Sequence, residues 1–264
     1  MRVRLEDGLS VYWRSHGDSE NPPLLMLNSI GTDLSLWGAV SRRLSHGLFT
    51  IRMDARGHGR TQASDGDYTL EQLAGDAVAL LDTIGLDRVA VAGVSLGGMI
   101  AMQMALDWPE RVSALIPVCT SAEMDKAAWA ARVDAVRAGG TEAIADLAMS
   151  RFLSPAFISE QPGFAQLVRD RLIAMEDRGY AGAAAAIRDM QIIDRLPQIS
   201  CPTLVIAGDR DQSTPFYGHG DRIFSAIPRA RAVHIDCAHL APLEAPAELA
   251  RHIHKFLAEA RDND

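Results

Sequence analysis

The chain has 264 residues, of which 48% are hydrophobic and 23% are charged, and its formal net charge is -8. This length and composition are typical of a globular protein with one large domain and room for an insertion. An acidic chain offers no overall positive field to nucleic acid or to an anionic membrane, so we expect neither as a partner. Any site for an anion has to be local.

The first residues predict neither a signal peptide nor a membrane anchor. Charged residues interrupt the sequence from Arg2 to Asp7, and no window approaches the apolar length of a membrane span. The cysteines, Cys119, Cys201 and Cys237, are odd in number and lack the spacing of a metal site. We therefore expect reduced, structural cysteines in a cytoplasmic protein.

Short apolar runs alternate with helical patterns in the first 120 residues. The chain opens with a predicted hairpin whose strands, 3–6 and 9–13, flank Asp7-Gly8, a pair that suits a type I′ turn. Further strands are predicted over 24–27, 49–53, 88–92 and 114–119, and a helix over 70–84 that ends at Gly85. Strands that alternate with helices in this way indicate a mostly parallel, doubly wound α/β sheet.

The alternation stops between residues 121 and 195. This segment is rich in alanine and charged residues at helical spacing, with breaks at Gly139-Gly140, Ser154-Pro155 and Gln161-Pro162-Gly163. Strands resume at 203–207 and 231–235, and a last helix is predicted from about Pro246 to Ala260. We expect a core formed by residues 1–120 and 196–264, and a helical cap, residues 121–195, inserted over the ends of its strands.

A serine follows the strand predicted over 88–92 at the start of a helical pattern. The sequence there is Gly93-Val94-Ser95-Leu96-Gly97, the Gly-x-Ser-x-Gly pattern of a nucleophile elbow. A sharp strand-to-helix turn can hold the serine in a strained conformation, and small residues on both sides leave room for the crossing. Ser95 is therefore the candidate nucleophile.

An acid and a histidine follow two later strands. Ligands of a parallel sheet bind beyond the carboxyl ends of its strands, and Asp211 follows strand 203–207 while His239 follows strand 231–235. The order Ser, Asp, His is the one expected of a hydrolase built on this sheet. Asp209 competes with Asp211 for the acid position and is otherwise explained as a turn residue.

These motifs resemble the α/β-hydrolase superfamily over nearly the whole chain. The resemblance includes Asp54-Ala55-Arg56-Gly57-His58-Gly59 and Trp108-Pro109-Glu110-Arg111-Val112. A narrower resemblance lies in 27–37, because Asn28-Ser29, where most members carry His-Gly, is followed by Gly-Thr-Asp-Leu-Ser-x-Trp from Gly31 onward. This segment is similar to the 3-oxoadipate enol-lactonases.

The resemblance implies a serine hydrolase that opens the lactone ring of 3-oxoadipate enol-lactone in the β-ketoadipate pathway of aromatic catabolism, with no metal or organic cofactor. His239 would act as the base for Ser95, and Asp211 would orient the histidine. The backbone N–H groups of Ile30 and Leu96 would stabilise the oxyanion.

The substrate carboxylate needs a local cation or a strong donor in an acidic protein. Trp129 and Arg132 lie three residues apart in the predicted cap, on one face of a helix, and resemble residues at matching positions of enol-lactonases. Arg151 is a second candidate. The alternative is that Trp129 anchors the cap and Arg132 is solvated.

Two other functions stay open at this point. A carboxylesterase or a carbon–carbon bond hydrolase would use the same acyl chemistry on another small molecule. A ligand receptor of hydrolase fold would bind without turnover, although an intact set of Ser95, Asp211 and His239 argues against it. The oligomeric state is not encoded in any of these motifs.

Overall fold

The computed structural model describes residues 1–261, and within them eight strands form one sheet in the order β1-β2-β4-β3-β5-β6-β7-β8. The strands are β1 (Arg2–Arg4), β2 (Ser10–His16), β3 (Pro23–Leu27), β4 (Phe49–Met53), β5 (Val89–Val94), β6 (Val112–Val118), β7 (Thr203–Gly208) and β8 (Ala230–Ile235). Strand β2 pairs antiparallel with β1 and β4, and every pairing from β4 to β8 is parallel. The predicted mostly parallel α/β sheet is confirmed.

The opening hairpin has a different turn from the one predicted. Its strands pair Arg4 with Ser10, and the Gly8 N–H donates to Leu5 O at 2.9 Å. A type I′ turn requires positive φ at both Asp7 and Gly8, but only Gly8, with a φ of 90°, has it. The prediction of a two-residue turn is wrong, because glutamate, aspartate and glycine together form a three-residue loop in which one glycine supplies the left-handed position.

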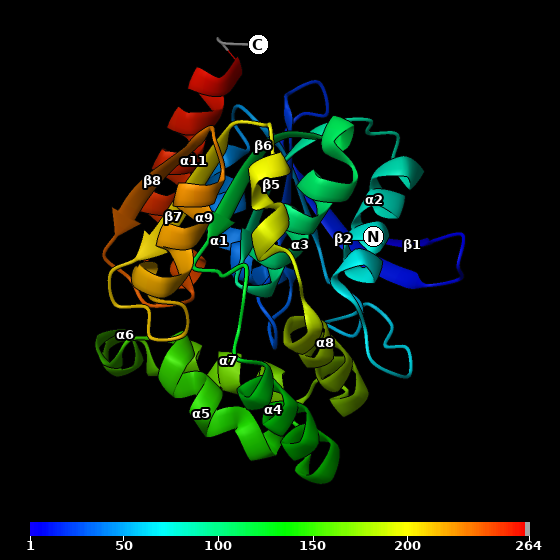
Figure 1. The fold of residues 1–264 in the computed structure, drawn as a ribbon, viewed down its shortest axis with the longest axis vertical. Coiled ribbons are helices and arrows are strands. Elements are labelled where there is room, and N and C mark those ends of the chain that lie inside the picture. The colour runs from blue at the N-terminus through cyan, green and yellow to red at the C-terminus, as the bar shows by residue number, and fades with distance from the viewer. Residues whose placement is uncertain (262–264) are drawn as a thin grey trace.

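Helices cover both faces of the sheet (Figure 1). In the core they are α1 (Gly38–Leu44), α2 (Leu70–Thr83), α3 (Leu96–Asp107), α9 (Asp221–Ala226), α10 (Ala241–Glu244) and α11 (Pro246–Arg261), with 3₁₀ turns at Leu34–Trp37, Pro109–Arg111 and Ile193–Gln198. Helix α2 begins where the Thr69 hydroxyl accepts from Gln72 N at 3.1 Å, and Gly85 follows its end with a φ of 74°. Helices α2 and α3 pack together on one face, and α1 and α11 on the other.

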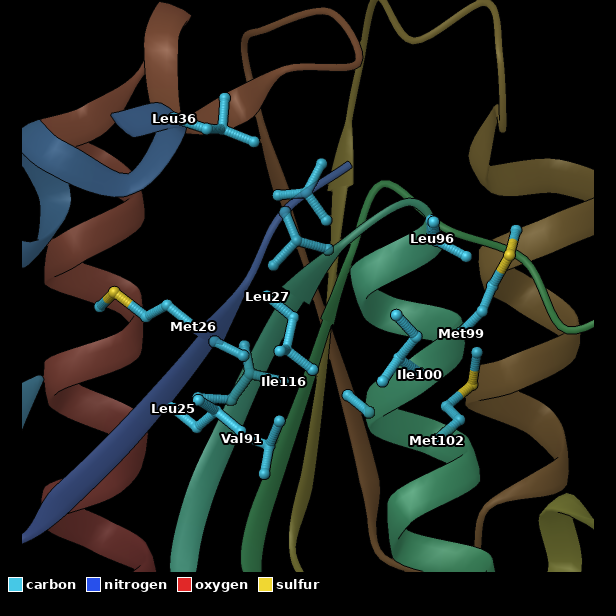
Figure 2. Close-up of a cluster of buried hydrophobic side chains, with 14 of the residues drawn as sticks. Leu25, Met26, Leu27, Leu36, Val91, Leu96, Met99, Ile100, Met102 and Ile116 are labelled. Carbon is cyan, nitrogen blue, oxygen red and sulfur yellow. The ribbon is translucent and has the colours of Figure 1, made fainter. Parts of the chain in front are cut away.

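The core lies between the central strands and the helices on either face. Figure 2 shows Met26 of β3 pointing toward α11, while Ile100 and Met102 of α3 lie on the opposite side of the sheet. Every residue of β5 is buried, which explains why its sequence is a continuous apolar run rather than an alternation. The central strands therefore lie in the interior, whereas β1, β2 and β8, toward the edges of the sheet, are partly exposed.

Five helices lie between β6 and β7 in the sequence, and we call them the cap helices. They are α4 (Lys126–Gly139), α5 (Glu142–Phe152), α6 (Pro155–Glu160), α7 (Pro162–Ile173) and α8 (Asp177–Asp189). In Figure 1 they form a separate layer below the sheet. Gly57 and Gly179 lie against each other where α8 contacts the loop after β4, since a Cβ on Gly57 would be 2.6 Å from Gly179 Cα. The inserted helical cap is confirmed, and its exact boundaries at residues 121 and 195 stay predictions.

Two further findings concern the residues that the structure describes. None of their helices has both the length and the apolar character needed to cross a bilayer. Cys119, Cys201 and Cys237 are free thiols in this part of the chain, and Cys119 and Cys237 are fully buried.

Candidate active site

Ser95 occupies the turn between β5 and α3. Its backbone has a φ of 55° and a ψ of -118°, and α3 begins at the next residue. A non-glycine residue with positive φ is strained, so the surrounding contacts must hold it in place. The Ser95 N–H donates to Val118 O at 3.0 Å, and the Thr120 hydroxyl donates to Ser95 O at 2.6 Å. The neighbouring strand β6 and the residues after it thus fix the elbow.

The glycines beside Ser95 are required by close backbone contacts. A Cβ on Gly93 would lie 2.1 Å from the carbonyl carbon of Gly97, and a Cβ on Gly97 would lie 2.3 Å from Leu27 O. Neither contact is possible for an L side chain without movement of the backbone. The steric reason for the Gly-x-Ser-x-Gly pattern is therefore present in this chain.

Asp211 and His239 meet beyond the ends of β7 and β8. The His239 ring places Nδ1 2.9 Å from Asp211 Oδ2 and 3.0 Å from Oδ1, and both side chains are buried. A carboxylate can only accept, so this geometry favours a proton on Nδ1 and leaves Nε2 free to accept one. Asp209, the competing acid, instead pairs with His234 on the surface at 2.9 Å.

The surroundings of Asp211 keep its carboxyl ionised. Burial by itself raises the pKa of Asp211, but the charge and hydrogen bond of His239 and backbone hydrogen bonds from Thr214 and Ser213 outweigh it. The net effect is a pKa below the usual range. Ser213 N donates to Oδ1 at 2.7 Å, and the Thr214 hydroxyl donates to Oδ2 at 2.9 Å. The carboxylate is thus held in one orientation toward the imidazole.

The loop that carries His239 is fixed by contacts that the sequence did not reveal. Phe152 of α5 stacks on the His239 ring with centroids 5.9 Å apart and an angle of 15° between the planes. The Leu240 N–H donates to Phe152 O at 3.0 Å. A cap helix therefore contacts both the ring and the backbone of the histidine loop.

Glu244 is the second contact that the sequence analysis missed. One carboxylate oxygen accepts from Ser154 N at 2.6 Å, and the other accepts from Ala238 N at 3.1 Å. The side chain is 3% exposed and lies 3.7 Å from the Arg210 guanidinium. Glu244 therefore links the cap to the residues immediately before Asp211 and His239. In the sequence, the only indication that Glu244 could contact this loop is its position five residues after His239.

Ser95, His239 and Ile30 line one cavity of about 340 Å³ between the sheet and the cap helices. No hydrogen bond joins the Ser95 hydroxyl to the His239 ring among residues 1–261. Such bonds are often long before substrate binds. Much of the remaining lining is apolar and includes Met99, Met124, Ile144 and Phe152. This arrangement suits a small, mainly apolar molecule presented to a serine.

The loop after β3 is shaped by the Asn28 side chain. The Asn28 amide donates to Thr32 O at 2.7 Å and to Ser29 O at 3.1 Å, so it closes the turn that carries Ile30. Leu96 is the first residue of α3, where N–H groups have no partner within the helix. The loop and the helix start both adjoin Ser95. Their roles as donors to an oxyanion stay predictions.

Trp129 and Arg132 both line the cavity that contains Ser95, as does Arg151. The Arg132 guanidinium lies 4.9 Å from the centre of the Trp129 ring, a cation–π contact, and donates to Tyr180 Oη at 3.4 Å. Neither arginine forms an ion pair with a carboxylate within the described chain, whose last residue is 261. The cavity therefore holds cationic groups that form no ion pair with the described residues.

A model of the alpha/beta hydrolase fold matches residues 22–246, which include all three candidate catalytic residues. The chain belongs to the α/β-hydrolase family. This α/β-hydrolase is 31% identical over 239 residues to 3-oxoadipate enol-lactonase 2 of Acinetobacter baylyi, covering 90% of this chain and 89% of that protein. It is also 30% identical to a putative carbamate hydrolase of Variovorax paradoxus, covering 79% of this chain and 81% of that one.

A solved structure resembles this α/β-hydrolase along nearly its full length. The enol-lactonase from Burkholderia xenovorans superimposes with a TM-score of 0.94 at 29% identity, covering 98% of this chain and 100% of that chain. The predicted membership of the superfamily and the resemblance to enol-lactonases are confirmed. The relatives also include a putative carbamate hydrolase, so they show that the chain is a hydrolase but do not identify its substrate. The substrate has to be inferred from the residues that line the cavity.

Proposed function

We propose that this α/β-hydrolase is a serine hydrolase that opens the lactone ring of 3-oxoadipate enol-lactone. The observation that carries the proposal is the Arg132 guanidinium, stacked on Trp129 and free of any carboxylate in the described chain, inside the cavity that Ser95 lines. A ring lactone with a carboxylate substituent needs an apolar space beside one cation and a nucleophile. The resemblance of 27–37 and the enol-lactonase relatives support the same substrate.

In the proposed mechanism the Ser95 hydroxyl attacks the lactone carbonyl while His239 Nε2 takes its proton. Asp211 holds the ring through Nδ1 and stabilises the imidazolium that forms. The N–H groups of Ile30 and Leu96 donate to the oxyanion. The ring C–O bond then breaks, His239 returns the proton to the enol oxygen, and an acyl-enzyme remains on Ser95.

Water completes the proposed reaction. His239 takes a proton from the water as it attacks the ester, the Ser95 oxygen leaves with that proton, and the free acid is released. The leaving enol stays attached to the acyl group throughout, because it belongs to the same molecule, and ketonises to 3-oxoadipate. The proton transfers of ring opening and of ester hydrolysis all use the His239 ring.

Turnover of the lactone beside simple esters tests the proposal. We expect the purified protein to hydrolyse 3-oxoadipate enol-lactone with a much larger kcat/KM than p-nitrophenyl acetate, and Ser95→Ala to lose at least about 1,000-fold in kcat. Circular dichroism and thermal unfolding of Ser95→Ala provide the folding control. Hydrolysis of the ester without hydrolysis of the lactone would reject the substrate and favour a carboxylesterase, whereas parent-like turnover by Ser95→Ala would reject the mechanism.

A further inference from the structure

A second cavity, of about 510 Å³, lies on the other side of the loop after β3. It is lined by residues of β2 and β4, by the loop from Gly31 to Ser35 and by the end of α7, and it shares no lining residue with the cavity at Ser95. The chain passes from the lining of one cavity to that of the other between Ile30 and Gly31. We call it the arginine cavity, because Arg14, Arg52, Arg60 and Arg171 line it.

Arg52 is the unusual residue of the arginine cavity. It is 6% exposed, and its guanidinium donates to Leu34 O at 3.4 Å and contacts His16 Nδ1 at 3.2 Å. Its Nε has no hydrogen-bond partner in the described part of the chain. It forms no ion pair with any carboxylate of residues 1–261. Buried arginines are nearly always paired, because an isolated charge in the interior is costly. Arg52 therefore has no carboxylate of the described chain in direct contact with its guanidinium.

The acids near Arg52 are already engaged. Asp54 accepts from Leu34 N at 2.6 Å and from Arg60 N at 2.8 Å. Asp33 pairs with Arg171 at 3.5 Å and accepts from Ser35 N. Neither carboxylate forms an ion pair with Arg52, and the pKa of Arg52 is lowered because burial and the charges of Arg42 and Arg14 outweigh the charge of Asp54.

Two more arginines, which have no carboxylate partner among residues 1–261, lie at the edge of the arginine cavity. Arg14 and Arg60 lie over the ring of Tyr12 at 5.6 and 5.0 Å from its centre, and Arg14 Nε donates to Tyr12 Oη at 2.8 Å. Burial lowers the pKa of the nearby His16, and the charges of Arg52, Arg42 and Arg14 lower it further. Four arginines and two carboxylates, Asp33 and Asp54, line the arginine cavity, so its lining carries a net positive charge in a chain whose net charge is -8.

We propose that the arginine cavity binds a small oxyanion with two negative charges, either a phosphate group or a dicarboxylate, with Arg52 as its buried partner and Arg14 and Arg60 at its mouth. A guanidinium donates to carboxylate and phosphate oxygens in matching planar geometry, and both anions offer several acceptors. Three arginines around one cavity provide the charge that a dianion requires. The loop 31–35 would form one wall of this site.

Calorimetric titration of the whole protein tests the site with inorganic phosphate and, separately, with succinate, at constant ionic strength. We expect saturable binding of at least one of them, and the anion that binds identifies the preferred oxyanion. Arg14→Gln combined with Arg60→Gln should weaken binding by at least about tenfold. Arg43→Gln, which removes an exposed arginine of α1 outside the cavity, should leave the affinity unchanged.

Arg52→Met provides a second, independent test of the anion site. It should abolish the anion-dependent rise of the melting temperature that the parent protein shows, since ligands that bind only the folded state stabilise it. If Arg52→Met does not fold, the double variant at the mouth decides the question. The site is rejected if the parent binds neither anion saturably, or if the double variant binds as tightly as the parent. This experiment measures binding alone, so its failure would leave the proposed reaction at Ser95 untouched.

Discussion

At the scale of single residues, the candidate site depends on side chains whose neighbours hold them in one arrangement. His239 is 2% exposed and its Nδ1 faces the Asp211 carboxylate, so only the other ring nitrogen is free to accept a proton. Arg132 is held by an aromatic ring and a phenol, neither of which neutralises it. The first arrangement is suited to a base, and the second to an anionic substrate.

Arg132→Gln tests the binding of the substrate carboxylate. We expect KM for the enol-lactone to rise about tenfold or more, because a charged hydrogen bond contributes roughly 1.5–3 kcal/mol, while hydrolysis of a neutral ester stays near the parent rate. Steady-state kinetics on both substrates measure this difference. Arg151→Gln is the matched comparison, since Arg151 lines the same cavity. A larger rise of KM in Arg151→Gln than in Arg132→Gln would assign the carboxylate to Arg151 instead.

At the scale of secondary-structure elements, the site is assembled by strand ends and secured by the cap. Gly208, at the end of β7, lies close to the histidine loop, because a Cβ there would be 2.6 Å from Cys237 O. Helix α5 supplies Phe152 to the His239 ring, and Glu244 of α10 joins the start of α6 to the same loop. The cap helices and the histidine loop are thus coupled through Phe152 and through Glu244.

Glu244→Gln tests whether this coupling positions His239. The glutamine has one acceptor oxygen for two backbone N–H groups, so one of them loses its partner, and we expect the free energy of unfolding to fall by about 1–3 kcal/mol. We also expect kcat to fall about tenfold because the imidazole is less well oriented. Urea unfolding and steady-state kinetics provide the two readings.

The control for Glu244→Gln is the same substitution at Glu248, an acid of α11 whose side chain is 40% exposed and pairs with Arg251 on the surface. It should change neither quantity appreciably, because exposed ion pairs contribute little. A Glu244→Gln protein that is less stable but retains the parent kcat would show that Glu244 supports the fold without positioning the histidine.

At the scale of the whole molecule, buried ionisable groups outside the site connect stability to pH. Burial lowers the pKa of His58 from 6.5 to about 4. Its Nδ1 contacts Arg56 O at 3.0 Å, while Nε2 has no partner among the residues that the structure describes. Between these two values the unfolded chain binds a proton on His58 that the folded chain does not. The free energy of unfolding should therefore decrease as the pH falls through this window.

Comparison of the parent with His58→Gln isolates this contribution. From about pH 7.5 to about pH 5 the parent should lose about 2 kcal/mol more than the variant, because the titration of His58 is absent from the variant. Urea unfolding at the two pH values gives the change in the free energy of unfolding with pH for each protein. A loss of stability in His58→Gln that is the same at both pH values does not affect this comparison. An equal change in the free energy of unfolding with pH in the two proteins would show that His58 is not buried in its neutral form.

The sequence predicted those parts of the molecule that depend on local pattern. The apolar runs located every strand of the parallel sheet, and strand ends located Asp211 and His239, because parallel strands bring their carboxyl ends to one edge. Phe152, Glu244 and Arg52 could not be found in this way. Their roles come from contacts between distant segments, such as Ser154 with Glu244, which are 90 positions apart.

The hairpin turn shows that composition can fail to predict structure even over a few neighbouring residues. Asp7-Gly8 fits a two-residue turn by composition, but the register of β1 on β2 requires a three-residue loop, and composition does not specify register. The placement of Trp129 and Arg132 could be predicted only in part. Their spacing predicted a shared face of α4, and only the packing of the cap over the sheet places that face in the cavity with Ser95.

Covalent labelling with a fluorophosphonate tests the central claim, that Ser95 is a nucleophile activated by His239 and Asp211. Intact-protein mass spectrometry followed by peptide mapping should find one adduct per chain, on Ser95. Asp211→Asn should label far more slowly, because the histidine loses its orienting partner and favours the wrong tautomer. An unlabelled parent protein, or equal labelling of the parent and Ser95→Ala, would contradict the account.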